Sequence, residues 1–243
     1  MTAPVRIAMW SGPRNLSTTM MRSFGARADT AVVDEPFYAA FLRRTGLRHP
    51  MTDEIFAAHE ADPERVAAML TGPVPGAAAV FYQKHMIHHM VDGLPMDWLG
   101  RIERHVILVR HPARVVASYT QKMETLSLEA IGVPQQEKLF ADLTQIFGAP
   151  PPVVDADCIL ADPEGVLKQL CVRIGISWDS AMLSWPPGPR AEDGAWAPHW
   201  YDAVWKSTGF GAAPGPVPEL SGAAAQTAKE ALAVYERLLE AHI

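Results

Sequence analysis

A cluster of small, hydroxyl-bearing and basic residues follows the first apolar segment of the chain and has the composition of an anion-binding loop. The apolar segment is residues 5–10, and residues 11–19 have the sequence Ser-Gly-Pro-Arg-Asn-Leu-Ser-Thr-Thr. A turn between a strand and a helix aims backbone N–H groups and the positive end of the helix at one point, where a phosphate fits. Arg14 adds a fixed positive charge, and the hydroxyl side chains add hydrogen-bond donors. The alternative is an ordinary helix start capped by Ser or Thr.

The same segment differs from the nucleotide-triphosphate P-loop, G-x-x-x-x-G-K-S/T, at the positions that hold the triphosphate and Mg²⁺. If Gly12 is the first glycine of that motif, Ser17 stands in place of the second glycine and Thr18 in place of the lysine. The basic residue, Arg14, lies early in the loop instead. The segment therefore predicts a phosphate-binding loop without the usual Lys–Mg²⁺ arrangement.

A second candidate for phosphate binding combines Arg110 with Ser118. Arg110 follows the apolar residues 105–109, and Ser118 lies about two helical turns further along the chain. An arginine at the end of a strand and a serine hydroxyl on the next helix can hold one phosphate from two sides. The alternative is an arginine in a surface ion pair and a serine on a solvated helix face.

Three histidines, His85, His88 and His89, lie in one short segment and raise the question of a metal site. Residues three and four positions apart share one face of a helix, as the two zinc ligands of H-E-x-x-H do. Met86 follows the first histidine where that motif has glutamate, and no acidic residue follows until Asp92. The segment therefore argues against a metal ion.

Short apolar segments alternate with helical patterns, which predicts an α/β protein whose parallel sheet is covered on both faces. We expect strands at residues 5–10, 31–33, 77–82, 105–109 and 153–154, and helices at residues 17–27, from Pro112 to about Lys122, between the N-cap Asp162 and Gly175, and at about 221–241. In such sheets ligands bind outside the carboxyl ends of the strands.

Polar residues follow four of these expected strands, at residues 11–19, at Asp34-Glu35, at residues 84–89 and at Arg110. These strand ends are the predicted site. The prediction requires Arg14 and Arg110 to lie close enough for one ligand to reach both.

The composition is that of a folded, acidic protein. The chain has 243 residues, of which 49% are hydrophobic and 20% charged, so disorder of the whole chain is excluded and one domain over residues 1–243 is expected. The net charge of −6 argues against a general nucleic-acid-binding protein, which needs an excess of basic residues.

Neither a membrane segment nor a disulfide framework is expected. The longest uncharged stretch, residues 66–83, contains two glycines and two prolines in its middle, which argues against a membrane span. Cys158 and Cys171 are too few for a disulfide scaffold, so we expect buried, reduced thiols. Since the first residues also do not fit a signal peptide, we expect a cytoplasmic protein.

Together, the two phosphate-binding candidates resemble the sulfotransferases that use 3′-phosphoadenosine-5′-phosphosulfate (PAPS). The 5′-phosphosulfate loop of that family has Pro-Lys/Arg-Ser-Gly-Ser/Thr-Thr, where residues 13–18 of this chain have Pro-Arg-Asn-Leu-Ser-Thr. Its 3′-phosphate segment has an arginine, seven residues and a serine, a spacing that Arg110 and Ser118 keep. The resemblance extends over about residues 5–210 and includes Asp-Pro-Glu-Gly-Val-Leu at 162–167 and, more weakly, Trp-Lys-Ser-Thr-Gly at 205–209.

The resemblance implies a three-layer α/β/α fold like that of the P-loop-containing nucleotide hydrolases. It implies transfer of a sulfuryl group from PAPS, without a metal, to a hydroxyl or amine of a small-molecule acceptor. Arg14 would stabilise the leaving bridging oxygen, and Arg110 and Ser118 would hold the 3′-phosphate. The residues implied in donor binding are Gly12, Pro13, Arg14, Asn15, Ser17, Thr18, Thr19, Arg110, Ser118 and Lys206.

A general base must take the proton of the acceptor, and the resemblance implies two kinds of base. Animal enzymes place a histidine after a lysine at this strand end, whereas some bacterial relatives place a glutamate before a proline after the second strand. Glu35 precedes a proline and ranks first. His85 follows Lys84 without the intervening residue of the animal enzymes and ranks second; His88 and His89 stay open.

The chain departs from the family pattern in its loop. Leu16 replaces the loop glycine, so its backbone must avoid a positive φ or bear strain. No tryptophan follows Ser17-Thr18, so any stacking on the adenine must come from elsewhere.

Two alternative functions remain open at this point: a metal-dependent P-loop small-molecule kinase and a nucleotide-binding relative without turnover. Residues 35–68 and 185–201 are expected to build the acceptor pocket. The acceptor itself and the oligomeric state are not predicted.

Overall fold

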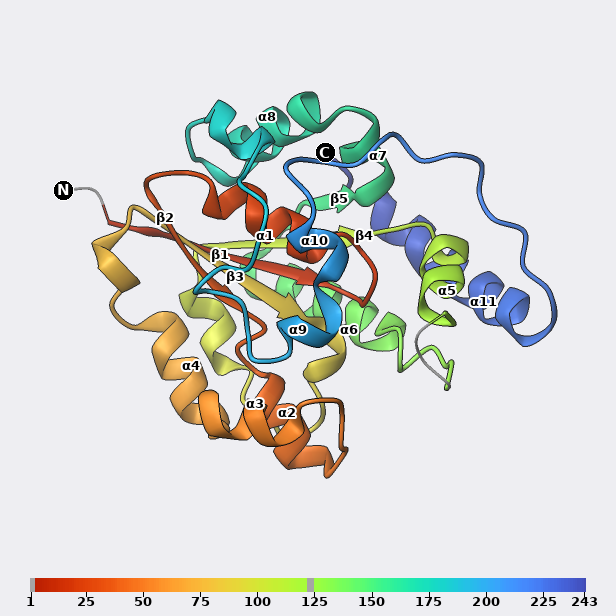
Figure 1. Ribbon diagram of the computed structural model, residues 1–243, viewed down its shortest axis with the longest axis horizontal. Helices are drawn as coiled ribbons and strands as arrows, with labels where there is room; N and C mark the ends of the chain where they lie inside the picture. Colours follow the sequence, from red (N-terminus) through yellow and green to blue (C-terminus); the bar gives the residue numbers. More distant parts are fainter. Residues whose placement is uncertain (1–2, 122–124) are drawn as a thin grey trace.

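The computed structural model describes residues 3–121 and 125–243. Five strands form one sheet in the order β2-β3-β1-β4-β5, and every neighbouring pair is parallel. The strands are β1 (Val5–Ser11), β2 (Thr30–Asp34), β3 (Val80–Met86), β4 (Arg104–Val109) and β5 (Val153–Asp155). Helices cover both faces of the sheet, so the predicted three-layer α/β/α fold is confirmed (Figure 1).

The predicted helices are present as α1 (Ser17–Gly25), α5 (Pro112–Tyr119), α8 (Pro163–Ile174) and α11 (Gly222–Leu239). The others are α2 (Tyr38–Thr45), α3 (Thr52–Ala58), α4 (Pro63–Thr71), α6 (Val133–Phe147), α7 (Ala156–Ala161), α9 (Ala197–Trp200) and α10 (Asp202–Trp205). The expected end of α5, Lys122, lies outside the described residues. As predicted, Asp162 caps α8 by accepting a hydrogen bond from the backbone of Gly165, and Gly175 ends it in the left-handed region.

The two faces of the sheet carry separate apolar cores. Because successive strand residues point to opposite faces, β1 supplies Ile7 and Met9 to the core under α1 and α8. It supplies Ala8 and Trp10 to the core under α4, α6 and α11. All strands are parallel, so their carboxyl ends meet at one edge, where β1 lies between β3 and β4.

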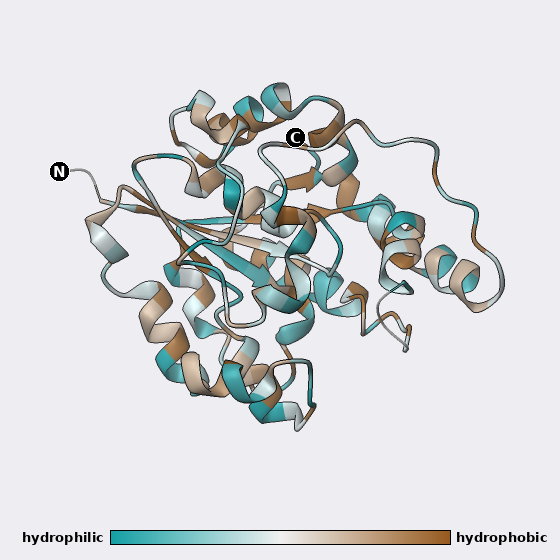
Figure 2. Ribbon diagram, viewed as in Figure 1, coloured by the Kyte–Doolittle hydropathy of each residue, from teal (hydrophilic) through white to brown (hydrophobic). Residues whose placement is uncertain are grey.

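The structure corrects the position of β3, which begins at Val80 rather than Ala77 and continues to Met86. The residues Gln83, Lys84 and His85 therefore lie inside a central strand rather than after it, and Figure 2 colours the end of β3 hydrophilic. Buried polar side chains are tolerated where they are hydrogen-bonded. The amide of Gln83, for example, donates to the carbonyl of Leu70 at 2.9 Å.

The structure also bears on the predictions about the two cysteines and about a membrane segment. Cys158 is exposed, contrary to prediction, because it lies on the outer face of the short helix α7; Cys171 is buried, and both thiols are free. None of the helices in the described residues has both the length and the apolar composition needed to cross a membrane.

Candidate functional site

The loop between β1 and α1, residues 12–16, passes twice through the left-handed backbone region. Arg14 has φ 63° and Leu16 has φ 69°. Leu16 therefore bears the positive φ that glycine adopts freely, at a cost of about 1–2 kcal/mol. Its side chain packs against the core on the α1 face, which offsets part of this cost. The first N–H groups of α1 have no partner within the helix and are available to an anion at this turn.

Gly12 permits the loop to approach the start of α6 closely. A Cβ atom at Gly12 would lie 2.6 Å from the backbone carbonyl oxygen of Ile131. That carbonyl belongs to backbone and cannot move aside as a flexible side chain could. Gly12 is thus required for the position of the loop, whatever its sequence motif.

We expect Gly12→Ala to lower the free energy of unfolding by about 1–3 kcal/mol, the usual cost of overpacking, and to displace the loop. Thermal unfolding and calorimetric titration with adenosine 3′,5′-bisphosphate measure the two effects. Gly100→Ala is the control, because a Cβ there would meet its nearest heavy atom only at 3.9 Å. Equal stability and nucleotide affinity in the Gly12 variant and the wild type would contradict the expectation.

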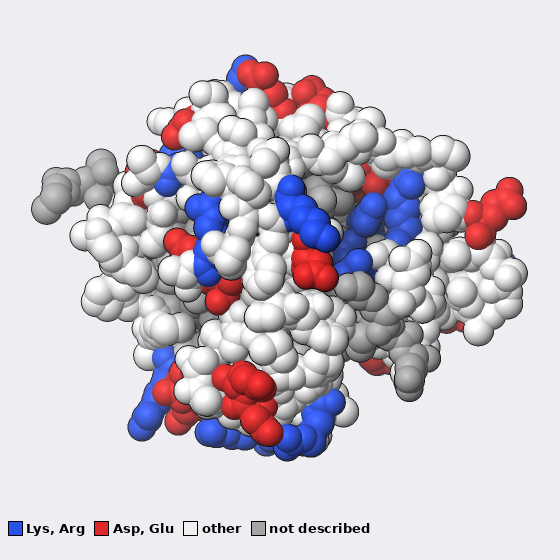
Figure 3. Space-filling model, viewed as in Figure 1, with Lys and Arg blue, Asp and Glu red and all other residues white. Residues whose placement is uncertain are grey.

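Arg14, Arg110 and Ser118 converge beside this loop. The Nε of Arg14 donates a hydrogen bond to the hydroxyl of Ser118 at 2.8 Å, and Arg110 donates from Nη1 to the backbone carbonyl of Arg14 at 3.0 Å. Figure 3 shows Lys and Arg side chains gathered in this part of the surface, over the loop after β1 and beside α5. Burial, and then the charge of Arg110, lower the pKa of Arg14. An anion between the two guanidinium groups would relieve this repulsion.

A carboxylate and a loop hold the arginines in place. Asp157 in α7 accepts a hydrogen bond from Nε of Arg114 at 2.7 Å, and its other oxygen lies 3.6 Å from Nε of Arg110. Arg114 also donates to the backbone carbonyls of Gly215 and Pro216. The segment that precedes α11 is therefore held next to Arg110 and Arg114.

The other residues predicted to bind the donor differ in how far they are buried. Asn15 is buried: its Nδ2 donates to the carbonyl of Leu108 at 3.3 Å, and its buried Oδ1 has no partner among the described residues. The buried hydroxyl of Ser17 lies 3.9 Å from the sulfur of Met86. Pro13, Thr18 and Thr19 are half-buried, and Lys206 is exposed. Lys206 is the C-cap residue of α10.

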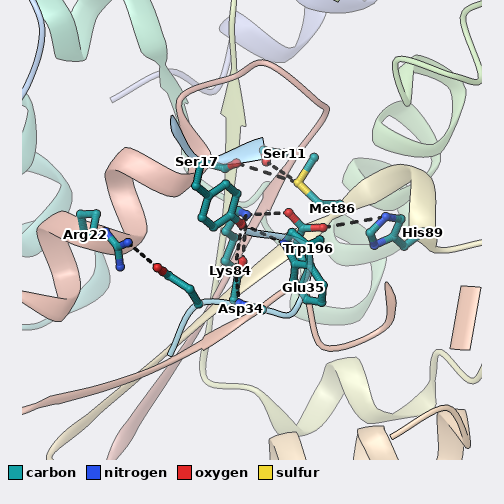
Figure 4. A network of polar contacts seen from close by, with 12 residues as sticks. Ser11, Ser17, Arg22, Asp34, Glu35, Lys84, Met86, His89 and Trp196 are labelled. Atoms are coloured by element: carbon teal, nitrogen blue, oxygen red, sulfur yellow. Dashed lines mark hydrogen bonds and ion pairs between the residues drawn. The ribbon is translucent and has the colours of Figure 1, made fainter. Parts of the chain in front are cut away.

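Glu35 lies in a buried polar network on the other side of β1, at the ends of β2 and β3 (Figure 4). Lys84 points its ammonium group at three oxygens: Asp34 Oδ1 at 2.8 Å, Glu35 Oε1 at 2.6 Å and the hydroxyl of Tyr201 at 2.6 Å. Arg110 follows β4, so it and Glu35 flank the loop after β1 from opposite sides. Lys84 lies in the predicted strand end at residues 84–89, and Tyr201 lies in the segment 185–201 that was expected to build the acceptor pocket. Neither residue was assigned a role in the reaction, because the contact between them is not visible in the sequence.

Glu35 has the environment of a proton acceptor. Burial raises the pKa of Glu35, the charge of Lys84 lowers it, and the charge of Asp34 raises it, with a net increase over its ordinary value. Its second oxygen, Oε2, lies 4.0 Å from Nε2 of His89, beyond hydrogen-bond distance. The side chain is 11% exposed, so it is not sealed off from solvent.

The structure places His85, the second-ranked base, on the opposite face of the sheet from Lys84. Its ring stacks on Trp10 at 4.2 Å and lies close to Trp98, inside the core that α4, α6 and α11 cover. Burial holds the pKa of His85 well below its ordinary value, so the ring is neutral. Consecutive strand residues face opposite ways, so His85 cannot reach the space that Glu35 faces.

The other two histidines lie near Glu35. His89 is buried between Tyr38, at 4.4 Å, and Phe41, at 4.9 Å, and is the nearer one to Glu35. His88 is half-buried, and burial lowers its pKa to about 3. Within the described residues no group of three or more His, Cys, Asp or Glu side chains is placed to hold a metal ion.

The segment from Asp193 to Tyr201 is held in place beside the Glu35 network by hydrogen bonds. Asp193 accepts a hydrogen bond from Arg22 of α1 at 2.7 Å, the backbone N–H of Gly194 donates to Asp34 at 3.1 Å, and Trp196 donates from Nε1 to the hydroxyl of Tyr201 at 3.1 Å. Trp196 and Tyr201 are buried, so their rings pack in the core. This part of the expected acceptor-pocket segment, residues 185–201, is therefore joined by hydrogen bonds to α1 and to the end of β2.

We expect Asp193→Asn to lower the free energy of unfolding at pH 7 by about 2 kcal/mol, because a buried hydrogen bond between charged groups is lost. Burial opposes ionisation of Asp193, but the hydrogen bonds from Arg22, the backbone of Arg190 and Trp205 hold its pKa below the ordinary value. Such a contribution is present above the unfolded-state pKa and lost as pH falls through the folded-state pKa.

Denaturant unfolding of both proteins between pH 7 and pH 3 tests this, since the difference should shrink below about pH 4. Asp53→Asn is the control, because Asp53 pairs with Arg48 while both side chains are exposed. A difference that stays constant over this range would mean that charge is not the cause.

Comparison with protein families finds a match to the model of the sulfotransferase domain over residues 5–240. Two curated proteins of Arabidopsis thaliana are similar to this chain: branched-chain-amino-acid aminotransferase-like protein 2, 40% identical over 205 residues, and protein 1, 41% identical over 211 residues. The alignments cover 84% and 86% of this chain but 36% and 37% of those proteins. The chain thus spans little more than a third of the length of these relatives.

Among solved structures, three sulfotransferases have a similar fold. The sulfotransferase domain of the Synechococcus PCC 7002 olefin synthase has TM-score 0.52, 18% identity and 95% of each chain covered. The sulfotransferase domain from the curacin biosynthetic pathway has TM-score 0.53, 15% identity and 96% and 99% covered. The sulfotransferase from Alicyclobacillus acidocaldarius has TM-score 0.55, 13% identity and 100% and 98% covered. At these identities the likeness concerns the fold.

Proposed function

Because the chain belongs to the sulfotransferase domain family, we propose that it transfers a sulfuryl group from PAPS to a hydroxyl or amine of a small-molecule acceptor. The observation that carries the proposal is the convergence of Arg14, Arg110 and Ser118 beside an anion-binding loop. Membership of this family supports sulfuryl transfer over the phosphotransferase alternative.

The donor is proposed to lie with its two phosphate ends on either side of Arg14. The 5′-phosphosulfate accepts hydrogen bonds from the backbone N–H groups and hydroxyls at the start of α1, including Ser17 and Thr18. The 3′-phosphate is bound by the guanidinium group of Arg110 and the hydroxyl of Ser118, which can hold one phosphate together. Arg14 touches both residues in the structure, so it is positioned to serve either phosphate. This division of labour fixes the register of the donor on the sheet.

In the proposed reaction the acceptor oxygen or nitrogen bonds to sulfur while the bond from sulfur to the bridging oxygen of the 5′-phosphate breaks. The products are the sulfated acceptor and adenosine 3′,5′-bisphosphate. The acceptor proton passes to Oε2 of Glu35, the carboxylate oxygen without a hydrogen-bond donor in its described surroundings. Arg14 stabilises the negative charge that develops on the bridging oxygen.

Calorimetric titration separates this proposal from its alternatives. We expect adenosine 3′,5′-bisphosphate to bind at least tenfold more tightly than AMP, because only the bisphosphate reaches Arg110 and Ser118, and ATP–Mg²⁺ to bind weakly. The variant Arg110→Met should abolish the preference over AMP while leaving the affinity for AMP unchanged. Equal binding of the three nucleotides would overturn the donor assignment.

Turnover is tested with ³⁵S-labelled PAPS and a panel of alcohols, phenols and amines. Transfer of label to at least one acceptor is expected. Tight binding of the bisphosphate without transfer to any acceptor would instead identify a nucleotide-binding relative that has lost turnover.

A further inference from the structure

We propose that Lys84 and Tyr201 are positioning residues for the general base: they fix one oxygen of Glu35 and leave the other free to take the acceptor proton. This inference rests on the proposed function, since it assumes that Glu35 is the base. Neither residue follows from the loop motifs that suggested the donor site.

Lys84 has no N–H group to spare for a substrate. An ammonium group has three donors, and the three oxygens within 2.8 Å of its Nζ belong to Asp34, Glu35 and Tyr201. The side chain of Lys84 is 1% exposed. Lys84 therefore acts on the reaction through Glu35 rather than by touching the sulfuryl group.

Tyr201 completes the network from the opposite end of the chain. Its hydroxyl accepts from Lys84 and from Trp196 Nε1 and donates to Asp34 Oδ2 at 2.7 Å. Asp34 Oδ2 also accepts from the backbone N–H of Gly194. Both carboxylate oxygens of Asp34 therefore accept hydrogen bonds, and Asp34 gives Lys84 a second acidic partner besides Glu35.

The consequence for Glu35 is a defined orientation. Its backbone has φ 38°, in the left-handed region that is costly for a residue other than glycine. The strain is held by a backbone hydrogen bond from Glu35 N to the carbonyl of Lys84 at 2.9 Å and by the side-chain bond to Lys84 Nζ. Oε1 is thereby fixed against β3, and Oε2 faces the side of His89 at 4.0 Å.

The same contacts set the proton affinity of the base. Burial raises the pKa of Glu35, and the charge and hydrogen bond of Lys84, with a smaller contribution from the hydrogen bond of Tyr201, lower it. Without Lys84, the burial of Glu35 and its repulsion from Asp34 would raise the pKa of Glu35 further, because the positive charge that lowers it is gone. Glu35 would then stay protonated to higher pH and would be a poorer base under ordinary conditions.

The test is a ¹³C NMR titration of the side-chain carboxyl of Glu35, assigned with Glu35→Gln, in the wild type and in Lys84→Met and Tyr201→Phe. We expect the midpoint to move upward by about one pH unit or more in the lysine variant and by less in the tyrosine variant. The pH below which sulfuryl-transfer activity is lost should move upward in each variant by the same amount as the midpoint of Glu35. The affinity for adenosine 3′,5′-bisphosphate should change less than about twofold, because neither residue touches the donor loop.

Tyr82→Phe is the matched control, since the hydroxyl of Tyr82 is as deeply buried on the same strand but has no hydrogen-bond partner among the described residues. It should leave the midpoint of Glu35 in place. If Lys84→Met does not fold, the smaller shift in Tyr201→Phe decides the question.

An unchanged midpoint in the folded variants would overturn the positioning role while leaving the proposed function intact. Absence of transfer in the wild type would instead remove the proposed function, and the titration would still report whether the network controls Glu35.

Discussion

Glu35→Gln is expected to lower the turnover number for sulfuryl transfer about a thousandfold, within the range typical for loss of a general base. The amide keeps the size of the carboxyl group, and its oxygen can still accept the hydrogen bond from Lys84 that Glu35 accepts at 2.6 Å. What it loses is the ability to take a proton. Donor affinity should stay the same, because Glu35 lies at the end of β2 and the donor contacts lie at the loop after β1 and at α5.

The pH dependence sharpens this prediction. Because the pKa of Glu35 is raised, wild-type activity should increase with pH as Glu35 loses its proton, and the residual activity of the variant should lack that increase. Glu164→Gln is the control, because Glu164 pairs with Lys168 on the exposed face of α8. Retention of more than a tenth of the activity, with the same pH dependence, would move the base from Glu35 to another group, and His89 is the nearest candidate.

The strand ends were predictable because each local signal agreed with the fold. Val5–Ser11 is mostly apolar and leads into a loop that begins with Gly12-Pro13, and Pro112 stands where a helix tolerates a missing N–H. The spacing of Arg110 and Ser118 placed an arginine before that helix and a hydroxyl on it. Parallel strands then bring their carboxyl ends together, which is why Arg14 and Arg110 could be expected to meet.

The base region was less predictable because its residues are stabilised by distant partners. Gln83, Lys84 and His85 look like the polar end of a strand. A lysine is stable inside the strand because Asp34, Glu35 and Tyr201 accept its hydrogen bonds, and Tyr201 lies 117 residues further along the chain. The position of the strand end also decides the ranking of the bases. Once β3 is extended through Met86, alternation sends Lys84 and His85 to opposite faces.

Arg14→Met is expected to weaken binding of adenosine 3′,5′-bisphosphate about tenfold and to lower the turnover number by a further factor of about a hundred. The first effect is the loss of a charged hydrogen-bond donor to phosphate, and the second is the loss of charge stabilisation at the leaving oxygen. Methionine is a suitable replacement because Arg14 has φ 63°. Methionine, like arginine, is strained at this positive φ, so the variant changes the side chain alone. Glycine would also relieve the backbone strain and so change the loop conformation.

Two comparisons decide the origin of these effects. Arg237→Met removes an arginine that is 58% exposed and pairs with exposed Glu137, outside the segments expected to build the acceptor pocket, so it should leave affinity and turnover unchanged. Raising the ionic strength should weaken nucleotide binding by the wild type more than by Arg14→Met, because the variant has one cation fewer to screen. If the variant binds the bisphosphate as the wild type does but turns over slowly, Arg14 acts on the sulfuryl end alone. If it loses affinity without losing turnover, Arg14 serves the 3′-phosphate with Arg110, and the charge at the leaving oxygen must come from the N–H groups that begin α1.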